Sequence, residues 1–566
     1  KVKFNEALVR FKGQGLACIF RINAAEESER DSGAVDAAVG NEDITAVIYT
    51  RLELSVDFDH KVLRGNAVLQ LKMKSMLSNE VITMDLKYLA SQSFLLEYFI
   101  KIEYETSPNS PALYWLTPDQ TSDGTHPLLI SNSKLTYARA IFPCQDTPSQ
   151  KSVFHAEISV PMGFNVMMAG HSNIMHYDGD RLIYKFNSNT RIPSYAVFII
   201  IGSLAQVTIS MDCGTCTLFA ERKYIQQSIM AFDRNIINYV LLIVNNIINK
   251  YPLRILNVCV LPPNIPEFDM QCPFVTFMSA TLLGGNYSLK NTIVQNIVES
   301  WIGGLVTIAN FEHLWLIKSF SAFIYRKIIN NIVDIEMQEL LDVKGINDLI
   351  NLHGHVALVP DLTDVLPNNI IKYVPYEKGR LLLNYLELFL CGPEAFQTFL
   401  LSYLRYCDST SSYLSIRTAD FKEYLYCCFC RNRHRGQVFH SDMDWDEWFY
   451  GLGLPPTHLG PVRRIACHLK AEQWITEQRI EEVFSTVSQL SVTNDLNKIE
   501  FLAYLHASPM VLSRYKLHIL RYAVLHDQHI CEIRRQVPFA AAVMTVSSRF
   551  RNHRDERASS LKVYAA

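Results

Sequence analysis

The segment "NTIVQNIVESWIGG", residues 291–304, is the most informative stretch of this 566-residue chain. Its apolar residues and its tryptophan occupy positions that a buried helix would turn toward a protein core. The polar positions hold Gln295, Asn296 and Glu299, and the segment contains no histidine. We therefore expect a core helix here, and the rest of the sequence must show whether its polar side supports catalysis.

Length and composition describe a large globular protein. A chain of 566 residues is too long for one core and fits roughly three domains. Hydrophobic residues make up 49% and charged residues 19%, so the chain can bury a large core and is not disordered as a whole. Lys and Arg total 53 against 56 Asp and Glu, a balance that argues against a nucleic-acid partner.

The expected location follows from the apolar runs and the cysteines. The longest apolar runs begin at Ser194 and Ile236, and both are shorter or more interrupted than the roughly 20 residues that a bilayer requires. We therefore expect no membrane span, and we expect that the first residues are not a secretory signal. The 13 irregularly spaced cysteines suit a reducing compartment. These features predict a cytoplasmic, intracellular protein, and we extend the hypothesis to association with the cytoskeleton.

Periodicity divides the chain into five segments. Residues 1–44 predict an N-terminal extension that ends in a polar linker. Alternating apolar and polar residues predict strands over 45–208, and mixed helix and strand patterns follow over 209–456. Helical patterns fill 457–548, and a basic tail occupies 549–566.

Four stretches resemble one known family in the same order. They are "RAIFPCQDTPSQKSVFHAEISVP" (139–161), "VESWIGGLVT" (298–307), "VPYEKGRLLLNYLE" (374–387) and "DWDEWFYGLGLPP" (444–456). This set resembles the zinc aminopeptidases of the leukotriene A(4) hydrolase and aminopeptidase B branch. The resemblance implies an α+β multidomain fold, with a β saddle N-terminal domain, a thermolysin-like mixed α/β domain and an all-helical C-terminal domain.

The resemblance also locates the family's zinc site. In that family one helix carries H-E-x-x-H, and a further glutamate ligand follows; the glutamate between the histidines is the general base. The corresponding positions in this chain are Gln295, Asn296, Glu299 and Lys318. An amide is a weak zinc ligand, Asn296 cannot accept a proton, and Lys318 places a cation beside the ion. We therefore predict that zinc is absent and that the chain is not an enzyme.

Other positions of the family site are also changed. The glutamate that binds the substrate amine falls at Gln271, and two glutamines that line the amine pocket fall at Asn132 and Lys134. The aspartate implicated in epoxide hydrolysis falls at Asn368. The tyrosine that stabilises the oxyanion is retained as Tyr376, but a phenol without a metal cannot generate a nucleophile. We expect Tyr376 to pack rather than to catalyse.

The cysteines give weaker signals. Cys213 and Cys216 have the C-x-x-C spacing of redox or metal sites, although two free thiols near a strand turn fit the pattern better. The stretch "CCFCRNRH" is either a helix end or a metal site, and its candidate ligands are Cys427, Cys428, Cys430 and His434. Cys272 is a nucleophile only in principle, because no histidine is placed to activate it.

The combined pattern favours a non-catalytic, aminopeptidase-like pseudoenzyme that serves as a structural or protein-interaction subunit. Two alternatives stay open: a zinc-dependent aminopeptidase or epoxide hydrolase with an atypical site, and a non-hydrolysing peptide-binding module. We expect protein partners, no nucleic acid and no cofactor. Our hypothesis for the setting is a large cytoskeletal or ciliary assembly, because inactive enzyme folds are often reused in this way.

Two of the changed positions predict a contact. In the family geometry the second histidine and the later glutamate both point at the metal, so Glu299 and Lys318 should converge and form a salt bridge. The alternative is that Lys318 extends into water and that Glu299 bonds to Gln295 or Asn296.

The segments outside the family pattern, residues 1–43 and the tail from Arg549, are expected to contact partners. Additions at the ends of a fold reach neighbours without disturbing its core, and "VKFNEALVRF" is suited to extend a partner's sheet. Deletion of both ends should therefore weaken co-purification with native partners and change localisation. Unchanged association would place the interface on the folded body.

Overall fold

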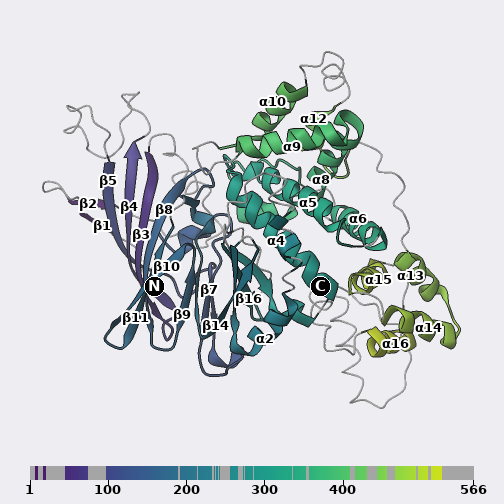
Figure 1. The fold of residues 1–566 in the computed structure, drawn as a ribbon, viewed down its shortest axis with the longest axis horizontal. Helices are drawn as coiled ribbons and strands as arrows, with labels where there is room; N and C mark the ends of the chain where they lie inside the picture. The colour runs from purple at the N-terminus through teal and green to yellow at the C-terminus, as the bar shows by residue number, and fades with distance from the viewer. Residues whose placement is uncertain are drawn as a thin grey trace.

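The computed structural model contains three regions that follow one another along the chain (Figure 1). It describes residues 7–10, 17–20, 45–73, 97–188, 191–212, 214–232, 235, 237–239, 241–242, 255–265, 272, 275–284, 286–333, 335–351, 356–407, 415–429, 443–455, 466–491, 495–507 and 512–524. A β region comes first, a mixed region follows, and a helical region comes last. This order confirms the α+β multidomain fold expected from the sequence.

The β region contains a seven-stranded sheet. Six strands follow the order β10-β11-β8-β3-β4-β5, and β12 also pairs with β8. β3 and β8 run parallel, whereas the other pairs are antiparallel. Burial alternates along β8 with the period of two that predicted strands here. The bounds are β3 (Thr45–Asp57), β4 (Val62–Met73), β5 (Glu97–Glu105), β8 (Lys151–Pro161), β10 (His171–Asp178), β11 (Arg181–Asn187) and β12 (Ile192–Pro193).

A second sheet of the β region contributes to the main core. Its order is β6-β7-β13-β9, and every residue of β7 and β13 is buried. Strands buried on both faces read as continuous apolar runs, and β13 follows this rule with the sequence IIIG. The bounds are β6 (Leu113–Leu116), β7 (Leu128–Ser131), β9 (Asn165–Met168) and β13 (Ile199–Gly202).

The mixed region joins a sheet to a layer of helices. The sheet order is β14-β15-β16-β17, and its last three strands are parallel. The expected domain boundary between residues 208 and 209 falls inside β14. The strand bounds are β14 (Leu204–Met211), β15 (Gly214–Glu221), β16 (Ile255–Leu261) and β17 (Val275–Ser279). The helices are α2 (Arg222–Ala231), α4 (Asn286–Leu305), α5 (Trp315–Ile329), α6 (Ile335–Asn351), α7 (Pro367–Ile370), α8 (Tyr376–Tyr385), α9 (Pro393–Cys407), α10 (Thr418–Phe429) and α12 (Trp445–Phe449).

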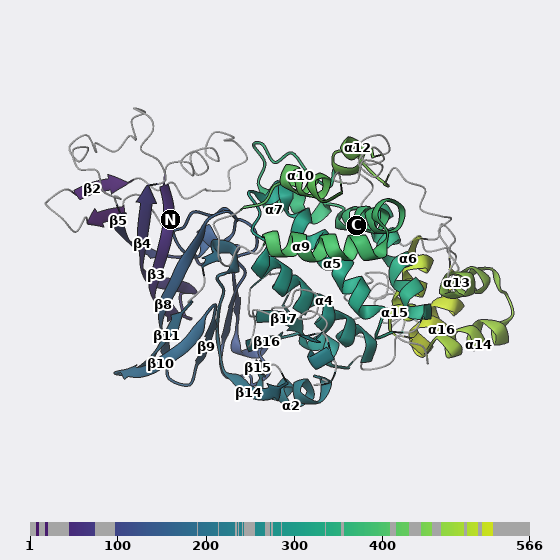
Figure 2. The same cartoon turned by 45° about the horizontal axis from the view of Figure 1, so that its top comes forward.

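α5 is the central helix of the mixed region (Figure 2). Eleven of its 15 residues are buried, and it packs between α4 and α8. Gly379 allows a very close approach of α8, because a Cβ atom at this position would lie 2.2 Å from Oγ of Ser319. A polar side chain on α5 must therefore find a partner inside the protein rather than in water.

The helical region has a core of its own. It comprises α13 (Ala466–Thr476), α14 (Ile480–Ser491), α15 (Asp495–Ala507) and α16 (Arg514–Val524). Most of its buried apolar side chains, among them Trp474 and Leu502, form a cluster separate from the main core, whereas Cys467 of α13 belongs to the main core. The helical pattern predicted for this part of the chain is confirmed.

The ends of the chain are described only in part. β1 (Ala7–Arg10) and β2 (Ala17–Phe20) form an antiparallel hairpin, and β1 lies beside β5 (Figure 1). The strand expected within "VKFNEALVRF" is thus β1, and along one edge it pairs with β2 of the same chain. The predicted linker at 23–43 and the tail at 549–566 lie outside the described residues. Within the described part, no helix combines the length and apolarity that crossing a membrane requires.

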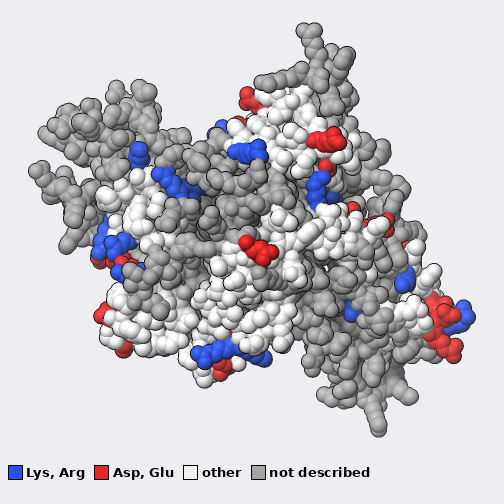
Figure 3. All heavy atoms as spheres, in the orientation of Figure 1, with Lys and Arg blue, Asp and Glu red and all other residues white. Residues whose placement is uncertain are grey.

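The described charges are spread over the surface. On the face shown in Figure 3, small groups of Lys and Arg side chains and small groups of Asp and Glu side chains are scattered over the described atoms. This distribution matches the nearly balanced charge of the sequence.

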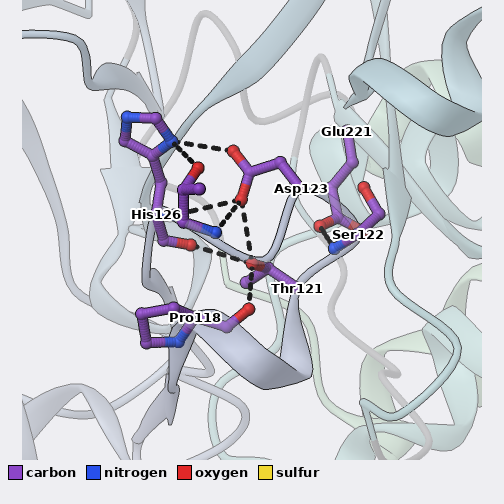
Figure 4. A network of polar contacts seen from close by, with 7 residues as sticks. Pro118, Thr121, Ser122, Asp123, His126 and Glu221 are labelled. Atoms are coloured by element: carbon purple, nitrogen blue, oxygen red, sulfur yellow. Dashed lines mark hydrogen bonds and ion pairs between the residues drawn. The ribbon is translucent and has the colours of Figure 1, made fainter.

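A polar loop fastens the β region to the mixed region (Figure 4). The loop is organised by Asp123, whose Oδ1 accepts the backbone N–H groups of Thr125 at 2.9 Å and His126 at 3.0 Å, and the hydroxyl of Thr121 at 3.2 Å. Its Oδ2 lies 2.8 Å from Nδ1 of His126. These contacts hold the preceding residue, Ser122, in a fixed direction.

Ser122 makes the connection to the mixed region. Its backbone N–H donates to Oε1 of Glu221 at 2.7 Å, and Glu221 stands at the start of α2 (Figure 4). Burial alone would raise the pKa of Asp123. The hydrogen bonds from His126, Thr125 and Thr121 outweigh burial and hold this pKa well below its usual range.

Asp123→Ala should therefore lower the free energy of unfolding by about 1 to 2 kcal/mol, because several hydrogen bonds of the loop are lost together. The depressed pKa means that this contribution is complete above about pH 4, the unfolded value, and disappears as pH falls through the folded value. Denaturant titrations at pH 7 and pH 3 measure it. A variant that costs as much at the lower pH as at the higher one would contradict this assignment.

Candidate functional site

The four positions assigned to zinc chemistry by the resemblance lie where α4 meets α5. Gln295, Asn296 and Glu299 belong to α4, and Lys318 lies near the start of α5. The side chains of Glu299 and Lys318 are only 17% and 14% exposed, whereas Gln295 is exposed. The helix pair thus brings two charged positions together in a mostly buried place.

The salt bridge predicted for these positions is confirmed. Nζ of Lys318 lies 3.1 Å from Oε2 of Glu299. The second oxygen, Oε1, accepts a hydrogen bond from Nε2 of Gln295 at 2.9 Å. One part of the alternative prediction, a bond between Glu299 and Gln295, therefore occurs together with the salt bridge. Both carboxylate oxygens of Glu299 have partners.

Asn296 bonds to the sheet instead of to this pair. Its Nδ2 donates to the backbone carbonyl of Phe277 in β17 at 2.8 Å. An amide can donate this bond, whereas a carboxylate at the same position has no hydrogen to donate. α4 is consequently tied to β17 through Asn296 and to α5 through Glu299.

The start of α5 is anchored to α10. Nε1 of the buried Trp315 donates to Oγ1 of Thr418 at 2.9 Å, and Nδ1 of His313 lies 3.0 Å from the same oxygen. Burial lowers the pKa of His313, which favours the neutral imidazole near pH 7. This anchor fixes the beginning of the helix and so the direction in which Lys318 projects.

The side chains at the α4–α5 junction do not fit a zinc ion. Catalytic zinc normally takes three protein ligands, whereas these four positions offer one carboxylate, already bonded to an ammonium and to an amide. A divalent ion about 4 Å from an ammonium meets a repulsion of about 8 kcal/mol at an effective dielectric constant near 20. Within the described residues, no group of three His, Cys, Asp or Glu side chains is placed to hold a metal.

Tyr376 lies close to this junction. It begins α8 and is partly buried. Its backbone carbonyl accepts a hydrogen bond from Oγ of Ser319, the residue after Lys318, at 2.8 Å. The backbone of Tyr376 therefore contributes to the packing of α8 on α5.

Three other predicted positions form a separate cluster. Asn368 in α7 donates from Nδ2 to the carbonyl of Lys134 at 3.2 Å, and its Oδ1 accepts the hydroxyl of Thr136. The backbone N–H of Lys134 donates to Oδ1 of Asn132 at 3.1 Å. The structure thus joins Asn132, Lys134 and Asn368 in one network between the β region and α7.

The predicted amine-binding loop is described in part. Gln271 lies outside the described residues. Cys272 is fully buried, and its carbonyl accepts the hydroxyl of Ser300 at 2.7 Å. Burial raises the pKa of the Cys272 thiol, which disfavours the thiolate that a nucleophile needs.

The other cysteine signals lead to no site within the described residues. Cys216 is buried in β15, and burial raises its pKa to about 12. Cys427 and Cys428 are exposed near the end of α10. Cys213, Cys430 and His434 lie outside the described residues, so the C-x-x-C pair and the second candidate metal site stay untested.

Sequence reasoning missed the partners of the predicted residues. Phe277, Thr136 and Thr418 contribute a carbonyl or a hydroxyl that fixes Asn296, Asn368 and the start of α5. A backbone carbonyl has no sequence signal, and single threonines in strands, loops and helices are too common to mark a site. Only the tertiary fold reveals these contacts.

The chain is similar to known peptidases along much of its length. Residues 96–196 match the peptidase M1 N-terminal domain, and residues 234–435 match the peptidase family M1 domain. Leukotriene A-4 hydrolase of Xenopus laevis is 31% identical over 391 residues, which cover 67% of this chain and 62% of that protein. Leucine aminopeptidase 2 of Emericella nidulans is 29% identical over 368 residues, which cover 63% and 58%. The chain thus spans about three fifths of the length of these relatives.

The fold likeness extends further than the sequence likeness. Yeast LTA4 hydrolase in complex with bestatin superposes with a TM-score of 0.76 at 23% identity and covers 94% of this chain and 90% of its own. This likeness supports the same succession of β, mixed and helical regions.

Lys318→Met should lower the free energy of unfolding by about 2 to 4 kcal/mol, because it leaves the mostly buried Glu299 without its counter-charge. Glu299→Gln should be similarly costly. The double variant should cost less than the sum, since neither charge is then left alone. Denaturant titrations of all three proteins form the cycle.

Lys372→Met is the matched control. Lys372 is exposed, so its loss should change the free energy of unfolding by no more than about 0.5 kcal/mol. Additive costs in the double variant would show that the two charges do not compensate one another.

Proposed function

Since the chain belongs to peptidase family M1, with its two family domains matched over more than half of the sequence, we propose that it is a non-catalytic member that serves as a structural or protein-interaction subunit. The chain has the fold of an aminopeptidase, and in our proposal it does not carry out the chemistry of its relatives. Fold alone does not imply activity, which depends on the side chains at the site.

The contact between Lys318 and Glu299 supports the proposal most directly. The ammonium of Lys318 lies 3.1 Å from Oε2 of Glu299. Its positive charge repels a metal ion, and it occupies the oxygen of Glu299 that Gln295 does not contact. Gln295 bonds to the other oxygen at 2.9 Å. A zinc ion would have to displace both partners and would then find a single strong ligand.

The position of the general base supports the same proposal. The side-chain amide of Asn296 is too weak a base to accept a proton, and its Nδ2–H group is already bonded to the backbone carbonyl of Phe277. General-base catalysis contributes about 10²- to 10⁴-fold, and metal activation of water contributes more. Tyr376 is retained, but a single oxyanion donor is worth only about 10²- to 10³-fold. The remaining groups fall far short of a hydrolase.

The fold remains a large, well-packed body that can bind other proteins. Most residues of α5 are buried, and the close contact of Gly379 with Ser319 keeps α8 against it. We propose protein partners on this basis, with the N-terminal segment of residues 1–43 as the first candidate for contacting them. A cytoskeletal or ciliary assembly is the setting to examine.

The purified protein should neither hydrolyse leucyl-naphthylamide nor open the epoxide of leukotriene A(4), the activities that its relatives' names suggest. It should also retain no stoichiometric zinc, because the junction of α4 and α5 offers one carboxylate paired with a cation. Product formation with added zinc and metal analysis after dialysis measure the two expectations.

A rebuilt variant provides the control. Gln295→His, Asn296→Glu, Glu299→His and Lys318→Glu together restore the family's ligands and base, and this variant should bind about one zinc ion per chain. Turnover by the unmodified protein that a chelator abolishes and Tyr376→Phe reduces would overturn the proposal. Stoichiometric zinc in the unmodified protein would do the same.

A further inference from the structure

α10 is tied to the rest of the mixed region at its first residues. Just before the helix, the backbone N–H of Ile416 donates to the carbonyl of Thr307 at 2.7 Å. Thr418, the first residue of α10, is buried and is contacted by His313 and Trp315. Farther along, α10 packs on α9, as Figures 1 and 2 also show. The polar contacts of Thr418 therefore contribute directly to the attachment of the helix.

The hydrogen bonds at Thr418 determine which nitrogen of His313 carries the ring hydrogen. Nδ1 of His313 lies 3.4 Å from the backbone nitrogen of Thr418 and 3.0 Å from Oγ1 of the same residue. A backbone N–H can only donate, so Nδ1 must accept, and the ring hydrogen belongs on Nε2. Oγ1 of Thr418 in turn accepts from Nε1 of Trp315 at 2.9 Å. These contacts together require a neutral imidazole.

A protonated His313 cannot keep all of these contacts. An imidazolium carries a hydrogen on both nitrogens, so Nδ1 would direct a hydrogen at the N–H of Thr418. The contact with Oγ1 can reverse its direction, whereas the contact with the backbone N–H cannot. The first turn of a helix also presents unpaired N–H groups and a partial positive charge, which repel a cation. Protonation therefore replaces an attraction at the start of α10 with a repulsion.

The charged groups around His313 do not reverse this preference. Burial is the largest influence and lowers the pKa of His313, whereas Glu312 and Asp420 favour the imidazolium and Arg417 opposes it. Oε1 of Glu312 already accepts the backbone N–H of Leu362 at 3.1 Å. The pKa of His313 therefore lies below its ordinary value although two carboxylates are nearby.

We propose that His313 is an acid-sensitive latch, which holds the start of α10 against the start of α5 while it is neutral and releases it when it takes up a proton. Phe421, one turn farther along α10, is fully buried and contacts Trp315 with 5.4 Å between the ring centroids. Release of the first turn gives water access to this contact. The latch is a property of the fold and does not depend on the proposed function.

The direction of the pH effect follows from the lowered pKa of His313. The attached state binds fewer protons at this side chain than a loosened state, in which water surrounds the imidazole. Attachment is therefore complete at neutral pH and above. It weakens as the pH falls below about 6.5, the ordinary pKa of histidine.

Hydrogen–deuterium exchange of the full chain tests the latch. After correction for the intrinsic exchange rate, amides of α10 should be protected roughly three- to tenfold more at pH 7.5 than at pH 5, the range expected for the loss of one hydrogen bond. Amides of β16, within the main core, serve as the internal reference and should show no such ratio. This comparison uses the unmodified protein and needs no variant.

Two substitutions of His313 give distinct expected results. His313→Asn offers a carbonyl oxygen close to the position of Nδ1 and never carries a charge, so the protection of α10 should stay high at both pH values. His313→Lys carries a charge at both pH values and has no acceptor, so the protection of α10 should be low at both.

His176→Asn is the matched control, since His176 is an exposed histidine of β10. This variant should keep the pH dependence of the unmodified protein. Equal protection of α10 in the unmodified protein at the two pH values would overturn the proposal, as would greater protection at pH 5 or a pH dependence that survives His313→Asn.

Discussion

The ion pair between Glu299 and Lys318 joins the helix that lies on the sheet to the helix at the centre of the mixed region. α5 is buried along most of its length, so Lys318 has little access to water and needs a partner within the fold. Glu299 supplies this partner from α4 at 3.1 Å. The packing of the two helices depends on both charges being present, because either one alone would remain mostly buried without its counter-charge.

The rest of the architecture does not require a metal. The start of α5 is fixed by Trp315 and Thr418, and the approach of α8 is fixed by Gly379 and Ser319. These contacts depend on packing and hydrogen bonds, which are indifferent to the ligands at the junction of α4 and α5. The contacts that fix the fold and the side chains at the family's zinc positions are therefore different sets of residues.

The sequence predicted the order of regions and the meeting of Glu299 with Lys318. The order of regions follows from local rules, because periodicity identifies strands and helices. The meeting of Glu299 with Lys318 follows instead from the resemblance, in which both positions correspond to metal ligands that converge on one ion. The hydrogen bonds of Asn296 and Asn368 were not predictable in this way. The carbonyl that accepts from Asn296 belongs to β17, and the hydroxyl that donates to Asn368 belongs to a loop residue 232 positions away in the sequence. Only the folded chain brings these groups close.

The separate core of the helical region has a consequence for folding kinetics. Its buried side chains come from residues 471 to 520, so each finds its neighbours within about 50 residues of chain. The seven-stranded sheet instead pairs Tyr49 with Val153, which requires closing a much longer loop. Local contacts form faster than distant ones, so the helical region should collapse before the sheet is complete. The chain should then fold and unfold as two cooperative units, and a single melting temperature would describe neither of them.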